Sequence, residues 1–598
     1  MYFVFISILS LSTVFYVRAD NSSTKHYKDK YIKYDAVQLT AKEKERVNES
    51  LKSLHERYDP EAKMIKRIVN RGASFAIDAQ SGTVMHEVLA SLNYAVSLLD
   101  IGDKQYSQRA FEVLEKTTLT QDQDPNSKSC GVWPYYMEEP LATKKSVIDL
   151  NWADFCAVRL LDIWMGHHDE LPVALKQIVK NALVMAGNAI QRRDCQPNYT
   201  NIAVMGTYVT YMVSHLFNLE DMKIYSGNRL KNFYDYTLDK GGFSEYNSPT
   251  YSIVALDEIY RMKSHIVEPS DKQMVDSLYS IDWKMIASHY HHPTGQWAGP
   301  HSRSYGPLTG KSFYGLLNEA SNGKIFPDAF EKWSDAKIKH QIPEYLLPYF
   351  LSPKYPRTET NIFDKDEPQI VGTCYMTDHY VFSTTTISSL WNQRHPFLVY
   401  WGSVQSPKYL QVQFLHDDFD FSSAYFFSRQ KENRALAAIH FFSTGGDKHI
   451  SIDRLKDGKF VAKDLRLRFK FGNVTDPNRL SLPTADNEQF SITLDNLKFN
   501  LQLCYSIFDN LKGHWEKGGD GRASWIDFVW YSGSETKFDL TKIEKAAMGF
   551  TFSVGTPGET MLHEKAKITT NENIMKSEWN GLVLEIPLKP QAPVRTFY

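Results

Sequence analysis

The sequence predicts two domains, a ring of antiparallel helix pairs followed by an antiparallel β-sandwich. Three observations predict this fold class. The chain has 598 residues, which is too long for one ordinary hydrophobic core. Helical spacing of apolar residues dominates the first 350 residues, and short segments rich in β-branched and aromatic residues dominate after Pro356. We therefore expect an N-terminal (α/α) toroid, an incomplete barrel of helix hairpins, joined to a sandwich of the multidomain α-then-β class.

The first residues predict secretion. An apolar run ends at Val17-Arg18-Ala19, which fits a signal peptide over residues 1–19. No basic residue precedes the run, so an uncleaved membrane anchor stays open as an alternative. Four Asn-X-Ser/Thr triplets also favour an extracellular glycoprotein; they begin at Asn21, Asn48, Asn198 and Asn473.

Helical periodicity assigns residues 20–350 to the toroid. In one segment, apolar residues recur at Val88, Leu92, Val96 and Leu99, three or four positions apart. The predicted helices span 42–58, 88–99, 149–165, 171–190, 202–217, 251–262 and 273–289. Several of them are apolar on more than one side, which favours a double-layered ring over a four-helix bundle.

The C-terminal part has the sequence pattern of an antiparallel β-sandwich. Its alternating, aromatic-rich segments predict strands at 380–387, 397–402, 409–416, 435–443, 465–471, 499–508, 525–532, 550–555 and 582–588. Glycine-rich turns such as 445–447 and 518–521 separate them. The stretch 351–368 contains three prolines and many charges, so we expect a linker there and the sandwich over 369–598.

Charge and cysteine content exclude several classes of function. A formal net charge of −2 argues against a protein that coats nucleic acid or an anionic membrane, although a local basic cleft is compatible with it. We expect no nucleic-acid partner and no stable membrane association, and the oligomeric state stays open. The five cysteines show no metal-binding spacing. Histidine groups at 167–169 and 289–292 lack a matched third ligand, so the sequence predicts no metal and no cofactor.

Three polar patches lie at predicted loop-to-helix junctions, where rigid elements hold side chains toward a shared surface. The first, 195–201, contains Tyr199 and Asn201. The second, 241–251, contains Glu245, Tyr246, Asn247 and Tyr251. The third, 297–306, contains Trp297, His301, Arg303 and Tyr305. Helix capping explains some of these residues individually. Three patches in successive loops, each with a Tyr and with an amide, His or Arg, together favour a functional site.

The order of helix pairs and sandwich resembles the polysaccharide lyases with an α/α toroid, including alginate, heparin and chondroitin lyases. In that group an Asn begins one inner helix and a catalytic Tyr begins another some fifty residues later. Asn201 lies 50 residues before Tyr251 and matches this arrangement, and Asn198 lies 53 residues before it. The family frequently has a His after the Asn, whereas Ile202 follows Asn201 here. The resemblance implies a secreted lyase that cleaves an acidic, uronate-containing polysaccharide by β-elimination.

The chemistry of elimination assigns a role to each residue. Removal of the C5 proton of a uronate requires that its carboxylate be neutralised, which Asn201 does with help from Glu245 or Arg303. Tyr251 is the expected acid, or both acid and base, and His301 is the first candidate for the base. Tyr305 and Tyr246 are rivals for these roles. Glu245, Tyr246, Asn247, Trp297 and Tyr199 are expected to bind substrate. His379, Arg394, His395 and His416 of the sandwich are weaker candidates.

Two other functions stay open. A toroid glycoside hydrolase requires two carboxylates, for which Asp154, Glu245, Asp257 and Glu258 are available. A non-catalytic secreted carbohydrate-binding protein requires none of these groups. The sequence does not distinguish alginate, glucuronan and glycosaminoglycan as substrates, nor endo from exo cleavage.

Overall fold

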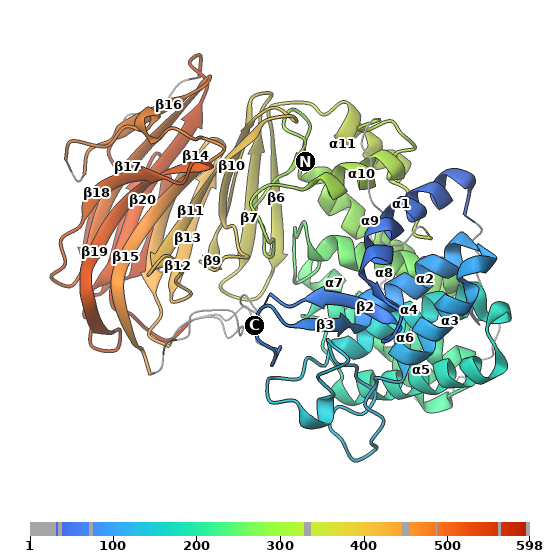
Figure 1. Ribbon diagram of the computed structural model, residues 1–598. Coiled ribbons are helices and arrows are strands. Elements are labelled where there is room, and N and C mark those ends of the chain that lie inside the picture. Colours follow the sequence, from blue (N-terminus) through green and yellow to red (C-terminus); the bar gives the residue numbers. More distant parts are fainter. Residues whose placement is uncertain are drawn as a thin grey trace, which may run out of the picture.

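The computed structural model describes residues 31–33, 39–70, 76–327, 337–444, 455, 457–485, 487–559 and 564–593. The predicted signal peptide, the triplet at Asn21 and the turn at 445–447 lie outside these residues. Figure 1 shows the two expected bodies, one of helices and one of strands. The fold class predicted from the sequence is confirmed.

The helical domain consists of antiparallel pairs in two layers. Its helices are α1 (Ala41–Arg57), α2 (Val88–Ile101), α3 (Lys104–Thr118), α4 (Trp152–His167), α5 (Val173–Arg193), α6 (Thr200–Leu216), α7 (Glu220–Lys240), α8 (Tyr251–His265), α9 (Pro269–Ser288), α10 (Lys311–Ala320) and α11 (Leu347–Leu351). Successive pairs, such as α6 with α7 and α8 with α9, pack side by side. The first helices of the pairs, α2, α4, α6 and α8, also contact one another in turn, and so form the inner layer.

Burial distinguishes the two layers. Every residue of α6 from Thr200 to His215 is buried, whereas α7 buries only one face. An inner helix is surrounded by protein and is therefore apolar on all sides, while an outer helix has a narrow apolar stripe. The outer helices α3 and α7 were not predicted, because charged residues surround the few core positions such as Leu230 and Phe233.

The sandwich has two antiparallel sheets. The larger runs in the order β18-β19-β15-β11-β10-β8-β7-β6, with β12 beside β11, and the smaller in the order β16-β17-β20-β14-β13-β9. Their bounds are β6 (Arg357–Asp364), β7 (Ile370–Met376), β8 (Tyr380–Thr385), β9 (Ile387–Ser389), β10 (Phe397–Gly402), β11 (Pro407–His416), β12 (Phe419–Asp420), β13 (Ala424–Lys431), β14 (Arg434–Phe441), β15 (Lys459–Gly472), β16 (Phe490–Leu494), β17 (Leu497–Phe508), β18 (His514–Gly519), β19 (Ala523–Asp539) and β20 (Ala546–Gly555).

A third antiparallel sheet covers the outer face of the smaller one. It contains β21 (Lys567–Asn571), β22 (Ile574–Trp579) and β23 (Leu582–Pro587). Met575, Trp579 and Ile586 pack there against Leu436 of β14 and Ala547 of β20. Small sheets in the helical domain comprise β1 (Tyr58–Asp59), β2 (Met64–Ile68) and β3 (Val84–Glu87), and separately β4 (Tyr290–His291) and β5 (Gln296–Trp297).

The segment expected as a linker contains an edge strand. Residues Arg357–Asp364 form the 8-residue strand β6, which pairs antiparallel with β7, so the linker predicted over 351–368 is wrong in its central part. The charges that suggested a linker alternate along β6, which buries little more than Phe363. Polar residues and a nearby proline are common on edge strands, which resist further pairing.

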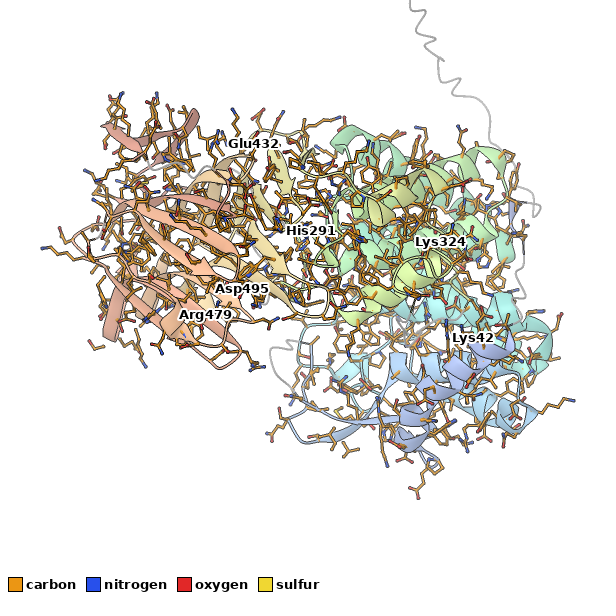
Figure 2. All side chains as sticks on the ribbon, turned by 90° about the horizontal axis from the view of Figure 1, so that it is seen from above. Lys42, His291, Lys324, Glu432, Arg479 and Asp495 are labelled. Carbon is orange, nitrogen blue, oxygen red and sulfur yellow. The ribbon has the colours of Figure 1, made fainter. Side chains whose placement is uncertain are left out.

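The two domains meet through the larger sheet and the loops that follow α7 and α9. All six residues of β8 and five of the six in β10 are buried, because both faces of these strands are covered. His301 and His395 form a β-bridge across the junction. Figure 2 labels His291 at this junction, where its Nε2 lies 2.8 Å from the carbonyl oxygen of Thr377. Gly299 allows the close approach, since a Cβ there would lie 2.8 Å from Leu398 Cδ1.

None of the helices described is long and apolar enough to cross a membrane. Each of the five cysteines is a free thiol in the structure. The described triplet asparagines Asn48, Asn198 and Asn473 are all exposed.

Candidate functional site

Two helix starts and one loop form the site. Asn201 lies in the first turn of α6 and Tyr251 is the first residue of α8. Ser248 fixes the start of α8, because its Oγ accepts a hydrogen bond of 3.0 Å from the backbone N–H of Tyr251. The same hydroxyl donates to the carbonyl oxygen of Arg303 at 2.5 Å. Tyr251 and Arg303 are therefore positioned by one shared side chain.

A chain of hydrogen bonds connects five of the residues that the sequence nominated. Glu245 Oε2 accepts from the backbone N–H of Asn201 at 3.1 Å, and Glu245 Oε1 accepts from Arg303 Nη1 at 3.3 Å. Arg303 Nη2 donates to the Tyr251 hydroxyl at 2.8 Å. The Tyr251 hydroxyl lies 2.8 Å from the Tyr305 hydroxyl. The predicted Asn, Glu, Arg and two Tyr thus belong to one network.

The sandwich completes the surroundings of Arg303. Gln393 Oε1 accepts from Arg303 Nε at 2.9 Å. The guanidinium carbon lies 4.4 Å from the Tyr251 ring centroid and 5.0 Å from that of Trp391. Gln393 and Trp391 come from the connection between β9 and β10 and were not predicted. The sequence feature that could have indicated them is a Trp followed by polar residues between two apolar strand patterns. It lies next to the weaker candidates Arg394 and His395.

Burial and charge act in opposite directions on the ionisable groups of this network. Burial raises the pKa of Glu245, while Arg303 and the backbone N–H of Asn201 lower it. Burial also raises the pKa of Tyr251 above its usual range, as do the adjacent Tyr305 and Glu245, against the opposing effect of Arg303. Tyr251 is consequently a neutral phenol at rest, beside a cation that would stabilise its phenolate.

Asn201 has unused hydrogen-bonding capacity. Its residue is 3% exposed, and its Oδ1 is buried with no hydrogen-bond partner in the described part of the chain. An amide oxygen left unpaired in a protein interior costs free energy unless another group satisfies it. The amide is therefore suited to a polar ligand that enters next to Glu245 and Arg303.

His301 does not occupy the position expected of a base. It is 3% exposed; its Nδ1 lies 2.8 Å from the carbonyl oxygen of Asn247 and its Nε2 lies 3.3 Å from the Tyr400 hydroxyl. Burial, with a smaller effect from His395, lowers its pKa to about 3. Both ring nitrogens are engaged in holding the loop against β10, so the prediction of His301 as the base is wrong.

Three residues expected to bind substrate are instead structural. Trp297 is fully buried, and its Nε1 donates to Asn247 Oδ1 at 2.5 Å. Asn247 is also fully buried; its Nδ2 donates to the carbonyl oxygens of Ala298 and Pro300, both at 2.9 Å. Tyr246 is 4% exposed and its ring stacks on Phe363 of β6, with centroids 4.0 Å apart. None of the three presents a face to a sugar.

Tyr199 and Tyr305 have accessible surface. Tyr305 is 69% exposed, with only its hydroxyl held by Tyr251. Tyr199 is half-buried, and its hydroxyl accepts from Asn151 Nδ2 at 3.2 Å. Half-buried Tyr135 and Trp152 lie beside this pair, with ring centroids 4.3 Å apart. Aromatic rings of partial exposure next to an amide are suited to contact with a sugar ring.

The four carboxylates considered for hydrolysis are engaged separately. Glu245 is paired with Arg303, Glu258 with Arg261 at 2.7 Å, and Asp257 with His340 at 2.8 Å. Asp154 is 1% exposed and lies 3.9 Å from Arg193. No hydrogen bond or ion pair within the described residues links one of these carboxylates to another. Over the same residues, no group of three or more His, Cys, Asp or Glu is arranged to hold a metal ion.

Comparisons with known proteins give one match to a family model and several distant solved structures. A family model described as a domain of unknown function, DUF8769, matches residues 44–318, which run from α1 into α10. No curated protein sequence matches the chain. The distant solved structures include a heparinase III, with 10% identity, a TM-score of 0.36, and coverage of 95% of this chain and 92% of that one. They also include endoglucanase CelQ from Clostridium thermocellum complexed with cellotetraose, with 10% identity, a TM-score of 0.24, and coverage of 80% and 71%.

Proposed function

We propose that this chain is a secreted polysaccharide lyase that cleaves an acidic, uronate-containing polysaccharide by β-elimination. The observation that carries the proposal is the hydrogen bond of 2.8 Å from Arg303 to the Tyr251 hydroxyl, in a network that also holds Asn201. Elimination requires a group that neutralises a carboxylate and a group that moves a proton. The network places the Asn201 side-chain amide, whose Nδ2 can donate to a carboxylate, near a phenol that lies next to a permanent cation.

The carboxylate of the substrate binds at Asn201. The amide N–H donates to it, and the charge of Arg303 stabilises the additional negative charge that develops when C5 loses its proton. Glu245 is a positioning residue, because it accepts from both the Asn201 backbone and Arg303 and so fixes their separation. A buried, preorganised set of donors is effective because it needs little rearrangement during the reaction.

Tyr251 carries the proton in both directions. Its phenol first gives up a proton through the Tyr305 hydroxyl, which reaches solvent. The phenolate, held by Arg303, takes the C5 proton; the C5–H electron pair forms the C4–C5 double bond, and the C4–O bond breaks. The phenol then returns the proton to the leaving oxygen and the phenolate is regenerated. Since the resting phenol has a raised pKa, only the deprotonated fraction of enzyme reacts.

The product spectrum tests this proposal. Purified protein is incubated separately with alginate, glucuronan, heparan sulfate and chondroitin sulfate, and the ultraviolet absorbance of the C4–C5 double bond is followed together with the number of new reducing ends. We expect both signals to rise in parallel with at least one substrate. Reducing ends without absorbance would demonstrate hydrolysis and overturn the proposal. Absence of both signals with all four polymers would overturn it as well.

A further inference from the structure

A second polar pocket lies between the two layers of the toroid. It has a volume of about 500 Å³ and is lined by the α5–α6 connection, by α6 and by α7. It shares no residue with the Asn201–Glu245–Arg303–Tyr251–Tyr305 network. A volume of this size is typical of small-molecule sites. The pocket is therefore a separate place where a ligand can bind.

The pocket combines aromatic walls with uncommitted amides. Phe233 is buried at its base, and Tyr225 and Tyr236 are half-buried. Asn228 and Asn232 are exposed on α7, one helical turn apart, which places their Cβ atoms about 5–6 Å from each other. Neither amide makes a hydrogen bond to another residue among those described. Two parallel amides, each a donor and an acceptor, match neighbouring hydroxyl groups of a sugar ring.

Arg229 fixes the polarity of the pocket. It is 7% exposed, and its Nη1 donates to the Tyr225 hydroxyl at 3.0 Å and lies 3.5 Å from Asp194 Oδ1. Its Nε is buried and has no hydrogen-bond partner among the described residues. Asp194 also lines the pocket and offsets the charge of Arg229, and Asp235 lines it as the ion-pair partner of Lys231. A site with this balance does not select an anion, so a uronate is a poor ligand and an uncharged polyhydroxyl ring is a good one.

We infer that this pocket binds a neutral sugar, a hexose or an N-acetylhexosamine, packed against the aromatic wall to which Tyr225 and Tyr236 contribute and held by Asn228 and Asn232. The inference does not rest on the proposed lyase activity. The sugar has two potential sources, a free saccharide or a glycan on the chain itself. Asn198 begins an Asn-Tyr-Thr triplet, is exposed, and directly follows Pro197, which lines the pocket.

Saturation-transfer difference NMR tests the inference on full-length protein made in bacteria, which carries no glycan on Asn198. The probes are glucose, galactose, mannose and N-acetylglucosamine, with glucuronate as the charged comparison. We expect saturation of at least one neutral sugar to exceed that of glucuronate. The signal should be lost in the double variant Asn228→Ala/Asn232→Ala and retained in Asn181→Ala, an exposed asparagine on α5. Alanine favours a helix, so circular dichroism should show intact folding in all variants.

Three results would overturn the inference: no signal for any neutral sugar, an undiminished signal in the double variant, or stronger saturation of glucuronate. The source of the sugar is identified in protein secreted from eukaryotic cells. If the glycan on Asn198 occupies the pocket, saturation of the free sugar is blocked there and is restored by Asn198→Gln. Equal saturation in the two secreted proteins assigns the pocket to free saccharide. Either result supports a neutral-sugar site.

Discussion

The guanidinium of Arg303 both stacks over the Tyr251 ring, 4.4 Å from its centroid, and donates a hydrogen bond of 2.8 Å to its hydroxyl. A cation in this position stabilises a phenolate through its charge and through a charge-assisted hydrogen bond. Burial acts in the opposite direction by raising the pKa of Tyr251. The reactivity of the site depends on the balance between these two effects.

Tyr251→Phe should lower kcat by roughly 10²- to 10⁴-fold, the range associated with loss of a general acid–base group. The substitution removes one hydroxyl and leaves the ring against Arg303, so unfolding by denaturant should change little. Steady-state rates on the preferred polysaccharide measure the effect. Tyr260→Phe, on the same helix α8, is the matched control and should keep the rate of the wild type.

The rate should increase with pH, because the proposed reaction uses the phenolate and burial raises the pKa of the Tyr251 phenol. Arg303→Gln removes the nearby cation that lowers this pKa, so the alkaline limb of the kcat/KM profile should move to higher pH. Arg394→Gln, which changes a neighbouring buried arginine over Trp391, should leave the limb in place. If the alkaline limb of the kcat/KM profile stays at the same pH in Arg303→Gln, Arg303 does not influence the ionisation of Tyr251.

Gln393 is expected to act through Arg303, because its Oε1 accepts from Arg303 Nε at 2.9 Å across the domain junction. Hydrogen bonds to charged groups contribute about 1.5–3 kcal/mol, so Gln393→Ala should lower kcat/KM by about one to two orders of magnitude. Gln393→Glu keeps the acceptor but adds a negative charge beside Arg303. It should therefore restore part of the rate and move the alkaline limb upward. If Gln393→Ala lowers the free energy of unfolding but leaves kcat/KM unchanged, the role of Gln393 is purely structural.

Gly206 permits the close packing of the inner helix α6. A Cβ at this position would lie 2.7 Å from Asp154 Oδ1 and 2.9 Å from Ile190 Cγ2. Overpacking of a filled interior typically costs about 1–3 kcal/mol, and we expect Gly206→Ala to lower the free energy of unfolding by that amount. Denaturant titration of wild type and Gly206→Ala measures the difference.

Acid should weaken the domain junction. Burial, the largest effect at each group, lowers the pKa of His289, His291 and His395 to about 4 and that of His301 to about 3. The unfolded chain binds protons at these groups below their ordinary pKa of 6.5, whereas the folded chain does not. Their contribution to stability is complete above pH 6.5 and is lost as the pH falls toward 4, by up to about 1.4 kcal/mol per pH unit for each histidine.

His301→Gln isolates one of these groups. Asp154 and Glu258 have opposite dependence, since burial raises the pKa of each to about 7 and the folded chain binds their protons first. The difference between the variant and the wild type removes that common background. The free energy of unfolding should fall less steeply with acid in His301→Gln. If the free energies of unfolding of His301→Gln and wild type depend on pH in the same way, His301 does not change its protonation on unfolding.

Periodicity in the sequence was sufficient for the inner helices, for the outer helices α5 and α9 and for the central strands, but not for the outer helices α3 and α7. The helices α2, α4, α6 and α8 are buried on most sides, so their apolar residues dominate the pattern. The outer helix α7 reaches the core with few residues, such as Leu230 and Phe233, within a charged sequence. Similarly, the sequence of β6 resembles a linker because its charged and polar residues surround a single core residue, Phe363.

The helix starts of the site were predictable, whereas the roles within its loops were not. Asn201 and Tyr251 stand at helix starts with a characteristic spacing. Both features can be recognised in the sequence without knowledge of long-range contacts. The burial of His301, Trp297 and Asn247 depends on how closely the loop after α9 approaches β10, which is a long-range contact. Gln393 and Trp391 join the network from the other domain, some ninety residues away in sequence.

The formation of unsaturated product by a Tyr251 variant shows whether Tyr251 shuttles the proton of an elimination reaction. The ultraviolet absorbance of unsaturated product is recorded for wild type and Tyr251→Phe on the same uronate polysaccharide. The mechanism predicts a steady increase with wild-type protein and an increase at least 10²-fold slower with the variant. Equal rates of increase in the two proteins, or cleavage by wild-type protein without any increase in absorbance, would contradict it.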